Sequence, residues 1–179
     1  MDTVSYYGCA AWIASNYGYG APFIWDNPKV EYTHKDTYRK DMDAMVRTTT
    51  IRTPDGDLTS ESTCFRADPP SPTQKPLKNL EADFPKFRHL LRPPTDINLK
   101  EVETIRKYCH ERNQAYGIGV GYPGLHGWFG AVQDGLESLA YASIDNPAIL
   151  DEWFELDMAI IVKTLELLCL NRNDTPLSQ

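Results

Sequence analysis

The stretch Met45–Phe65, MVRTTTIRTPDGDLTSESTCF, carries the clearest structural signature of the 179-residue chain. Two runs within it, Met45–Thr53 and Asp57–Phe65, are rich in Thr and include Val46 and Ile51, and these β-branched residues favour pleated strands. The Pro54–Gly56 segment between them has the Pro-Asp-Gly chemistry of a tight turn. The stretch therefore predicts an antiparallel hairpin with one solvated face.

The segments on either side of the hairpin extend this interpretation. KVEYTH, before the hairpin, predicts a further strand, and the proline-rich ADPPSPTQKPLKN after it predicts an extended, exposed connection. LEADFPKFRHLL is weakly helical in pattern, and Pro85 is expected to interrupt it because proline lacks the amide donor.

The second half of the chain has the pattern of an α/β protein. NLKEVETIRKYCHERN places Val102, Ile105 and Cys109 on one helical face, and YGIGVGYP predicts a buried parallel strand. A helix is predicted over Trp128–Ser143. Its inward-facing residues are expected to be Val132, Leu136, Leu139 and Ala140.

The last predicted helix runs from Pro147 to about Leu170. Asn146 or Asp145 precedes it as a cap, and proline is favoured at the first helical position. The polar tail that follows carries no further strand pattern. A single parallel strand needs pairing partners, so the sequence predicts one domain that is part of a larger α/β domain. Its expected segments are an irregular aromatic-rich segment (1–28), a hairpin region (29–66), an α/β part (95–171) and a polar tail (172–179).

The charge and the hydrophobic pattern of the chain argue against nucleic-acid and membrane partners. The formal net charge of −7 argues against a large nucleic-acid footprint, which needs a basic face. No apolar run is long enough to span a bilayer, so no membrane partner is expected. The N-terminus has no basic segment of a signal peptide, and the four cysteines are scattered without zinc-ligand spacing. These features predict a cytoplasmic protein with free thiols and no metal site.

Several of these motifs, taken in order, resemble the uroporphyrinogen decarboxylase superfamily. They are the TPDGDL hairpin, the DF…LL segment, the strand ending in GYP, and DGLESLAYASIDNPAILDEWF. The superfamily includes the haem-pathway decarboxylase and corrinoid-dependent methyltransferases, and the TP-x-G-x-L turn is more similar to the methyltransferase-like branch. The resemblance covers about Val30 to Leu170. It implies a partial (β/α)8 TIM barrel, its N-terminal or central portion, with the antiparallel hairpin as an insertion.

The resemblance implies one of two activities. One is decarboxylation of the tetrapyrrole uroporphyrinogen, which needs no cofactor. The other is methyl transfer between a corrinoid and a thiol activated by zinc. The decarboxylase's Arg-rich loop has no counterpart in residues 1–30, and neither its pyrrole-binding Asp nor the methyltransferase His-x-Cys and Cys zinc ligands are found. No cofactor is therefore expected in this chain, and zinc and corrinoid would require a C-terminal half.

The resemblance favours an enzyme, a decarboxylase (lyase) or a methyltransferase, although this chain alone lacks recognisable catalytic and zinc motifs. The alternative is a non-catalytic relative that acts as a ligand-binding or interaction module. The expected ligand is a tetrapyrrole or a corrinoid. A homo-oligomer or a complementing half-barrel is compatible with either reading.

The candidate site is GYPGLHGWFG, residues 121–130, at the C-terminal end of the predicted parallel strand. Barrels of this kind place their chemistry at that end. The predicted pocket-wall residues are Tyr122, His126, Trp128 and Phe129. By resemblance, Phe129 occupies the position of a substrate-contacting Tyr, whose hydroxyl it lacks. The structural alternatives are a core aromatic for Phe129, a backbone-bonded loop residue for His126, and packing on the next helix for Trp128.

Overall fold

The computed structural model describes residues 12–15, 22–121 and 125–170, and the structural statements below concern these residues. The chain divides into two compact units. The first unit consists of residues 1–26, 93–122 and 160–179, and the second of residues 27–92 and 123–159. Each unit is described by itself.

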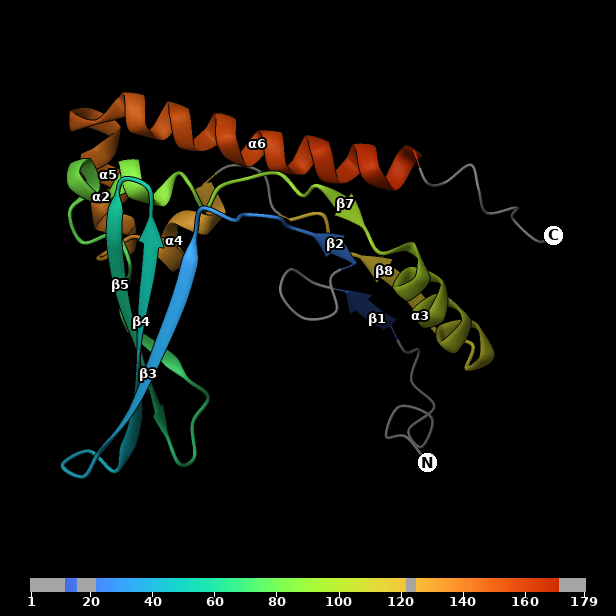
Figure 1. The fold of residues 1–179 in the computed structure, drawn as a ribbon, viewed down its shortest axis with the longest axis horizontal. Helices are drawn as coiled ribbons and strands as arrows, with labels where there is room; N and C mark the ends of the chain where they lie inside the picture. The colour runs from blue at the N-terminus through green and yellow to red at the C-terminus, as the bar shows by residue number, and fades with distance from the viewer. Residues whose placement is uncertain (1–11, 16–21, 122–124, 171–179) are drawn as a thin grey trace. The chain divides into compact units, whose positions relative to one another are not determined.

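A four-stranded antiparallel sheet dominates the second unit, with strand order β3-β4-β5-β6 (Figure 1). Its strands are β3 (Glu31–Arg39), β4 (Ala44–Thr53), β5 (Gly56–Phe65) and β6 (Ser71–Gln74). The predicted hairpin is confirmed: Thr53 pairs with Gly56, whose φ of 124° suits glycine at the end of the turn. The strand predicted before the hairpin is also confirmed, and it extends to Arg39.

The proline-rich connection contributes a strand that its sequence does not predict. β6 is exposed along its length and pairs with β5 across an irregular register at Glu61 and Ser62. Pro72 lies within this strand. Proline is tolerated there because β6 is an edge strand, where an amide donor on the solvent side is not needed.

Helix α2 (Leu80–Phe87) follows the sheet and contains Pro85, so the predicted interruption is wrong. The Asn79 side chain caps the helix by accepting a hydrogen bond from the Ala82 amide. Phe84 and Phe87 lie on either side of the proline and are both buried. Burial of these two rings offsets the one backbone hydrogen bond that proline cannot donate.

The predicted helix Trp128–Ser143 is two helices, α4 (Trp128–Ala131) and α5 (Gly135–Asp145). Val132 between them leaves the helical path and forms a parallel bridge with Leu77. Asp134 and Gly135 then have φ angles of 61° and 49°. The break changes the phase of the second helix.

Two of the inward-facing residues predicted for this region are therefore wrongly placed. Leu136 is 69% exposed, and Ala140 is also exposed. Val132 is buried and Leu139 packs against the core, as predicted.

The core of the second unit is built around aromatic rings. Trp153, on α6 (Pro147–Leu170), stacks on Phe84 and Phe87 at centroid distances of 5.8 Å and 5.1 Å. The Trp128 ring lies 5.2 Å from the same tryptophan. Ile51 and Leu58 bring the turn end of the hairpin into this cluster. The bounds predicted for α6 are confirmed.

The first unit contains two short strand pairs. β1 (Trp12–Ser15) pairs in parallel with β8 (Ala115–Ile118), so the predicted parallel strand is confirmed. Its predicted burial is wrong, because Ala115 is exposed and the other three residues are only partly buried. β2 (Phe23–Ile24) pairs antiparallel with β7 (Asp96–Ile97).

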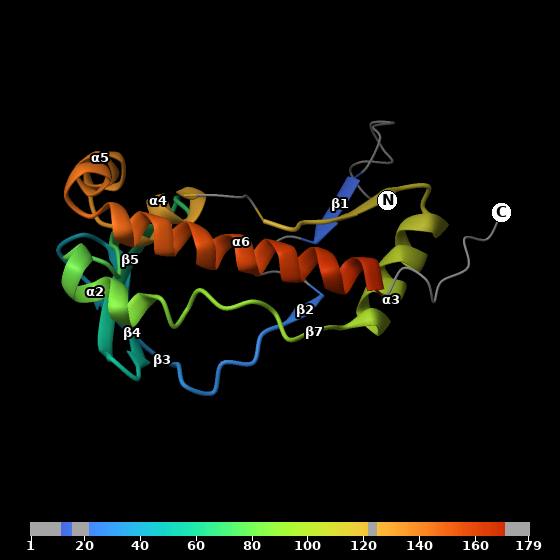
Figure 2. The ribbon, with the colours of Figure 1, turned by 90° about the horizontal axis from the view of Figure 1, so that it is seen from above.

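Helix α3 (Leu99–Glu111) completes the first unit together with the last turns of α6 (Figure 2). Cys109 of α3 is buried and Val102 and Ile105 are partly buried, so the predicted apolar face of this helix is confirmed. Val102 packs against a cluster formed by Phe23, Ile97 and Leu167.

The fold is thus a mixed α/β structure, as the sequence predicts at that level. No sheet closes on itself among the described strands, which form two pairs and one four-stranded sheet. In the described ranges, no helix is both long and apolar enough to cross a membrane.

Candidate functional site

Three of the four predicted site residues belong to the short helices after β8. Tyr122 lies outside the described residues. His126 belongs to the 3-10 turn η1 (Leu125–Gly127), and its side chain is also outside the description. Trp128 and Phe129 open helix α4, and both side chains are described.

Trp128 is fixed in the core. Its side chain is 0% exposed, and Nε1 donates a hydrogen bond to the carbonyl oxygen of Gly135 over 3.1 Å. This bond ties α4 to the first residue of α5 across the break between the two helices. A buried indole N–H needs such a partner, because leaving it unpaired costs about 1–3 kcal/mol.

Phe129 faces the other way and remains 45% exposed. Its Cδ1 atom lies 3.6 Å from the position that a Cβ atom on Gly135 would occupy, and Lys75 Nζ lies 3.7 Å from the same point. The consecutive aromatic residues therefore have different roles: one anchors α4 and the other presents a ring at the surface. Wall contact by Tyr122, His126, Trp128 and Phe129 stays a prediction.

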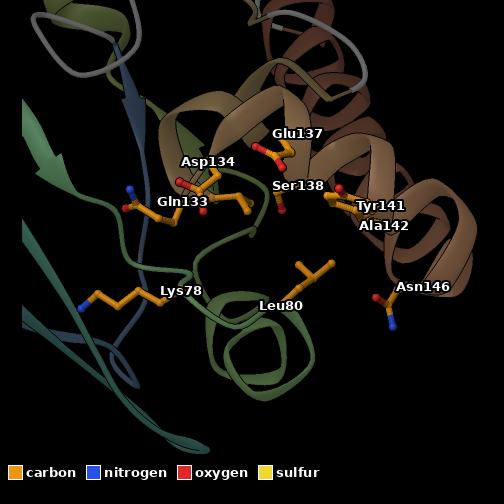
Figure 3. A pocket seen from close by; sticks show the side chains of 10 residues that line it. Lys78, Leu80, Gln133, Asp134, Glu137, Ser138, Tyr141, Ala142 and Asn146 are labelled. Atoms are coloured by element: carbon orange, nitrogen blue, oxygen red, sulfur yellow. The ribbon is translucent and has the colours of Figure 1, made fainter.

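A groove opens beside this corner, entirely within the second unit (Figure 3). Its volume is about 270 Å³, just below the range of about 300–1,000 Å³ typical of small-molecule sites. Asp134, the neighbour of Gly135, lies at one end of the lining. The full lining is Lys78, Leu80, Val132, Gln133, Asp134, Glu137, Ser138, Tyr141, Ala142 and Asn146.

Several polar groups of the groove are already engaged within the fold. Gln133 Oε1 accepts from the Lys75 amide at 3.0 Å, and Asn146 Nδ2 donates to Glu81 Oε1 at 2.8 Å. Lys78 turns its ammonium group toward the sheet, where it donates to Thr59 Oγ1 at 2.8 Å.

The other polar side chains of the lining include the carboxylates of Asp134 and Glu137 and the hydroxyls of Ser138 and Tyr141. Carboxylates accept hydrogen bonds and repel anions. The groove is therefore suited to a ligand that presents N–H or O–H donors, and it is poorly suited to one that presents carboxylates.

A second polar cluster joins the hairpin turn to the end of α2. His89 Nε2 lies 2.8 Å from Asp55 Oδ2, and Arg88 approaches the same oxygen at 3.5 Å. The hydrogen bond from His89 is the main cause that holds the pKa of Asp55 below its ordinary value. Asn27 in turn donates to the His89 carbonyl oxygen at 2.7 Å. These contacts clamp the β4–β5 turn onto the helix, which is a structural role.

Metal binding requires several His, Cys, Asp or Glu side chains close together. Within residues 12–15, 22–121 and 125–170, no group of three or more His, Cys, Asp or Glu side chains is arranged to hold a metal ion. The described residues thus do not fit the zinc that the methyltransferase resemblance implies.

The groove residues were not predicted from the sequence, although a signal was present. The Asp134-Gly135 pair is a typical turn dipeptide, and it marks the break beside which Asp134 lines the groove. The apolar spacing of residues 128–143 suggested one continuous helix instead.

No protein-family model, curated protein or solved structure matches this chain.

Proposed function

We propose that this chain has the barrel-type arrangement of the uroporphyrinogen decarboxylase superfamily and binds a corrinoid-like macrocycle against Phe129. One observation carries the proposal: α4 exposes Phe129, whose ring lies near Gly135, the chain neighbour of the groove residue Asp134, while Trp128 is fixed in the core. A ring held in this way offers a flat apolar wall, and stacking on a planar ligand is favourable beyond the area that it buries.

The parallel pairing of β1 with β8 supports the partial (β/α)8 architecture. Parallel strands with helical connections are the repeating unit of such barrels, whose ligand sites follow the C-terminal ends of the strands. The segment containing Leu125, Trp128 and Phe129 follows the C-terminal end of β8 in the chain.

The chemistry of the groove favours a corrinoid over uroporphyrinogen. A corrinoid carries neutral amide side chains, whose N–H groups can donate to Asp134 and Glu137. Uroporphyrinogen carries carboxylates around its whole edge, which these two residues would repel. Because the groove is small, it would hold one edge of the macrocycle, with Phe129 against the ring face.

Methyl transfer between a corrinoid and a thiol is accordingly the activity that we propose for this arrangement, with tetrapyrrole decarboxylation ranked second. Since the described residues do not fit zinc, no zinc-dependent step is assigned to them. Binding without catalysis is the alternative function. It is favoured by the groove lining, which among the described residues includes neither histidine nor cysteine.

A binding titration tests the proposal. Hydroxocobalamin and uroporphyrin I are added separately to the full chain, and quenching of tryptophan fluorescence is recorded. Hydroxocobalamin should bind more tightly, and Phe129→Ala should weaken its binding about tenfold through loss of the stacking surface.

Phe154→Ala is the matched control. Phe154 is 48% exposed, against 45% for Phe129, and it belongs to the same unit. Its replacement should leave the affinity unchanged. Equal affinities for the two variants, or tighter binding of uroporphyrin I than of hydroxocobalamin, would contradict the proposal.

A further inference from the structure

Strand β3 (Glu31–Arg39) forms one edge of the four-stranded sheet, and all nine of its residues are exposed. The opposite edge, β6, is short and lies among prolines, which limit further strand addition. β3 contains no proline. A long, unprotected edge of this kind has a row of backbone donors and acceptors available for pairing with another strand.

The sequence of β3, EYTHKDTYR, is complementary to itself when read antiparallel about Lys35. In that register, each residue faces the one equally distant from Lys35 on the second copy. The facing pairs away from the centre are Glu31 with Arg39, Tyr32 with Tyr38, Thr33 with Thr37, and His34 with Asp36. Oppositely charged, aromatic and Thr–Thr pairs across strands are all stabilising.

We propose that β3 is a homodimer interface, in which two copies pair antiparallel about a two-fold axis at Lys35 and form a continuous eight-stranded sheet. An isologous contact requires such self-complementarity, because the same patch meets itself. The register also matches the ladder geometry. Every second residue of an edge strand directs its amide and carbonyl groups outward. In the proposed register, residues whose backbone groups point outward face each other on the two copies.

The surface beside the edge fits this occupant. Tyr32, Tyr38 and Met45 lie on one face of the sheet and are 56%, 51% and 43% exposed. In the dimer, Tyr32 of one copy meets Tyr38 of the other, with Met45 next in the row. At each end of the interface, Tyr32, Tyr38 and Met45 thus form a row of large side chains that are exposed in the monomer.

The charged groups at the middle of β3 are also held in place for pairing. Asp36 forms a two-point ion pair with Arg47, at 2.7 Å and 2.8 Å. His34 Nδ1 lies 3.0 Å from Thr49 Oγ1, which leaves its Nε2 atom for Asp36 of the second copy. Both side chains are therefore oriented by β4 before the copies meet.

Lys35 is the one unfavourable position, since two like charges would face each other on the axis. Lys35 pairs with Thr48 on β4, which in turn pairs with Glu61 on β5. The Glu61 carboxylate partly offsets the positive charge of Lys35. We therefore expect a reversible dimer whose population rises between roughly 1 and 500 µM protein. This inference does not depend on the proposed function.

Disulfide trapping tests the register directly. In Lys35→Cys, the two introduced thiols would face each other at a Cα separation of about 4.5–5.5 Å, within the range that a disulfide spans. In the control Thr33→Cys, on the same strand face, the thiols would lie about 13 Å apart. Mild oxidation should yield covalent dimer at least about tenfold more readily for Lys35→Cys, with the wild-type chain giving the background from its native cysteines.

Charge exchange provides an independent test by sedimentation equilibrium. Glu31→Arg and Arg39→Glu each place like charges opposite one another and should weaken the dimer about tenfold, whereas the double variant should restore it. Lys35→Thr should tighten it. Equal trapping of the two cysteine variants, or a monomeric wild type and Lys35→Thr throughout this concentration range, would overturn the proposal.

Discussion

At the scale of single residues, Asp83 shows how one partly buried carboxylate organises the start of a helix. Its Oδ2 accepts hydrogen bonds from the amides of Lys78 and Asn79, both at 3.0 Å, and its Oδ1 accepts from Lys86 Nζ at 2.9 Å. Burial alone would raise the pKa of Asp83, but these hydrogen bonds outweigh it and hold the pKa below its ordinary value. The carboxylate therefore stabilises the fold in its ionised form.

This linkage predicts a pH-dependent effect of Asp83→Asn. Because the folded-state pKa lies below the unfolded one, the stabilisation is fully present above about pH 4 and is lost as pH falls through the folded value. Urea unfolding at pH 7 should show a loss of about 1–3 kcal/mol in the variant. At pH 3, below the ordinary aspartate pKa, the loss should be smaller than at pH 7, because part of the stabilisation of the wild type is already gone. An equal loss at both pH values would contradict the role given to the ionised group.

At the scale of elements, the aromatic cluster joins α2, α4 and α6 through one ring. Trp153 is 1% exposed and contacts Phe84, Phe87 and Trp128. Asn146, just before α6, adds a hydrogen bond to Glu81 of α2 at 2.8 Å. The core of the second unit thus depends on α6, on which Trp153 is buried and the next residue, Phe154, is exposed.

This contrast predicts opposite outcomes for two adjacent substitutions. Trp153→Ala should lower the free energy of unfolding by about 3–5 kcal/mol, because it removes a large buried ring and leaves a cavity. Phe154→Ala should change it by less than about 0.5 kcal/mol, since Phe154 is 48% exposed. Thermal or urea unfolding followed by circular dichroism measures both. Similar losses for the two variants would show that the assigned core is wrong.

The elements also show which features the sequence could predict. The β4–β5 hairpin and α6 were predictable because their signals are local: a Pro-Asp-Gly turn and a proline at the first helical position. The break between α4 and α5 was missed because Val132 pairs with Leu77, which is distant in the chain. β6 was missed for a related reason, since its strand conformation depends on pairing with β5.

The candidate site was predictable only in part. The glycines and aromatics of the segment after β8 predict wall residues Tyr122, His126, Trp128 and Phe129, and that role stays a prediction. The groove was not predicted, because its lining combines Lys78 and Leu80 with residues of α5. Neither segment carries a pattern that indicates the other.

At the scale of the whole molecule, the chain combines two surfaces with separate proposed roles. The corner at Phe129 is assigned to a macrocycle, and the edge strand β3 to a second copy of the chain. Both lie in the second unit but in different segments, residues 123–159 and 27–92. Loss of either role should therefore leave the other measurable.

The most direct test of the central claim is a ¹H–¹⁵N NMR titration of the 20.3 kDa chain with hydroxocobalamin. We expect saturable shift changes concentrated in the amides of residues 125–130 and 134–138, around Phe129 and the acidic residues of the groove. The same titration of Phe129→Ala should require about tenfold more ligand to reach equal changes. Changes confined to β3–β6, or no saturable change at all, would contradict the account.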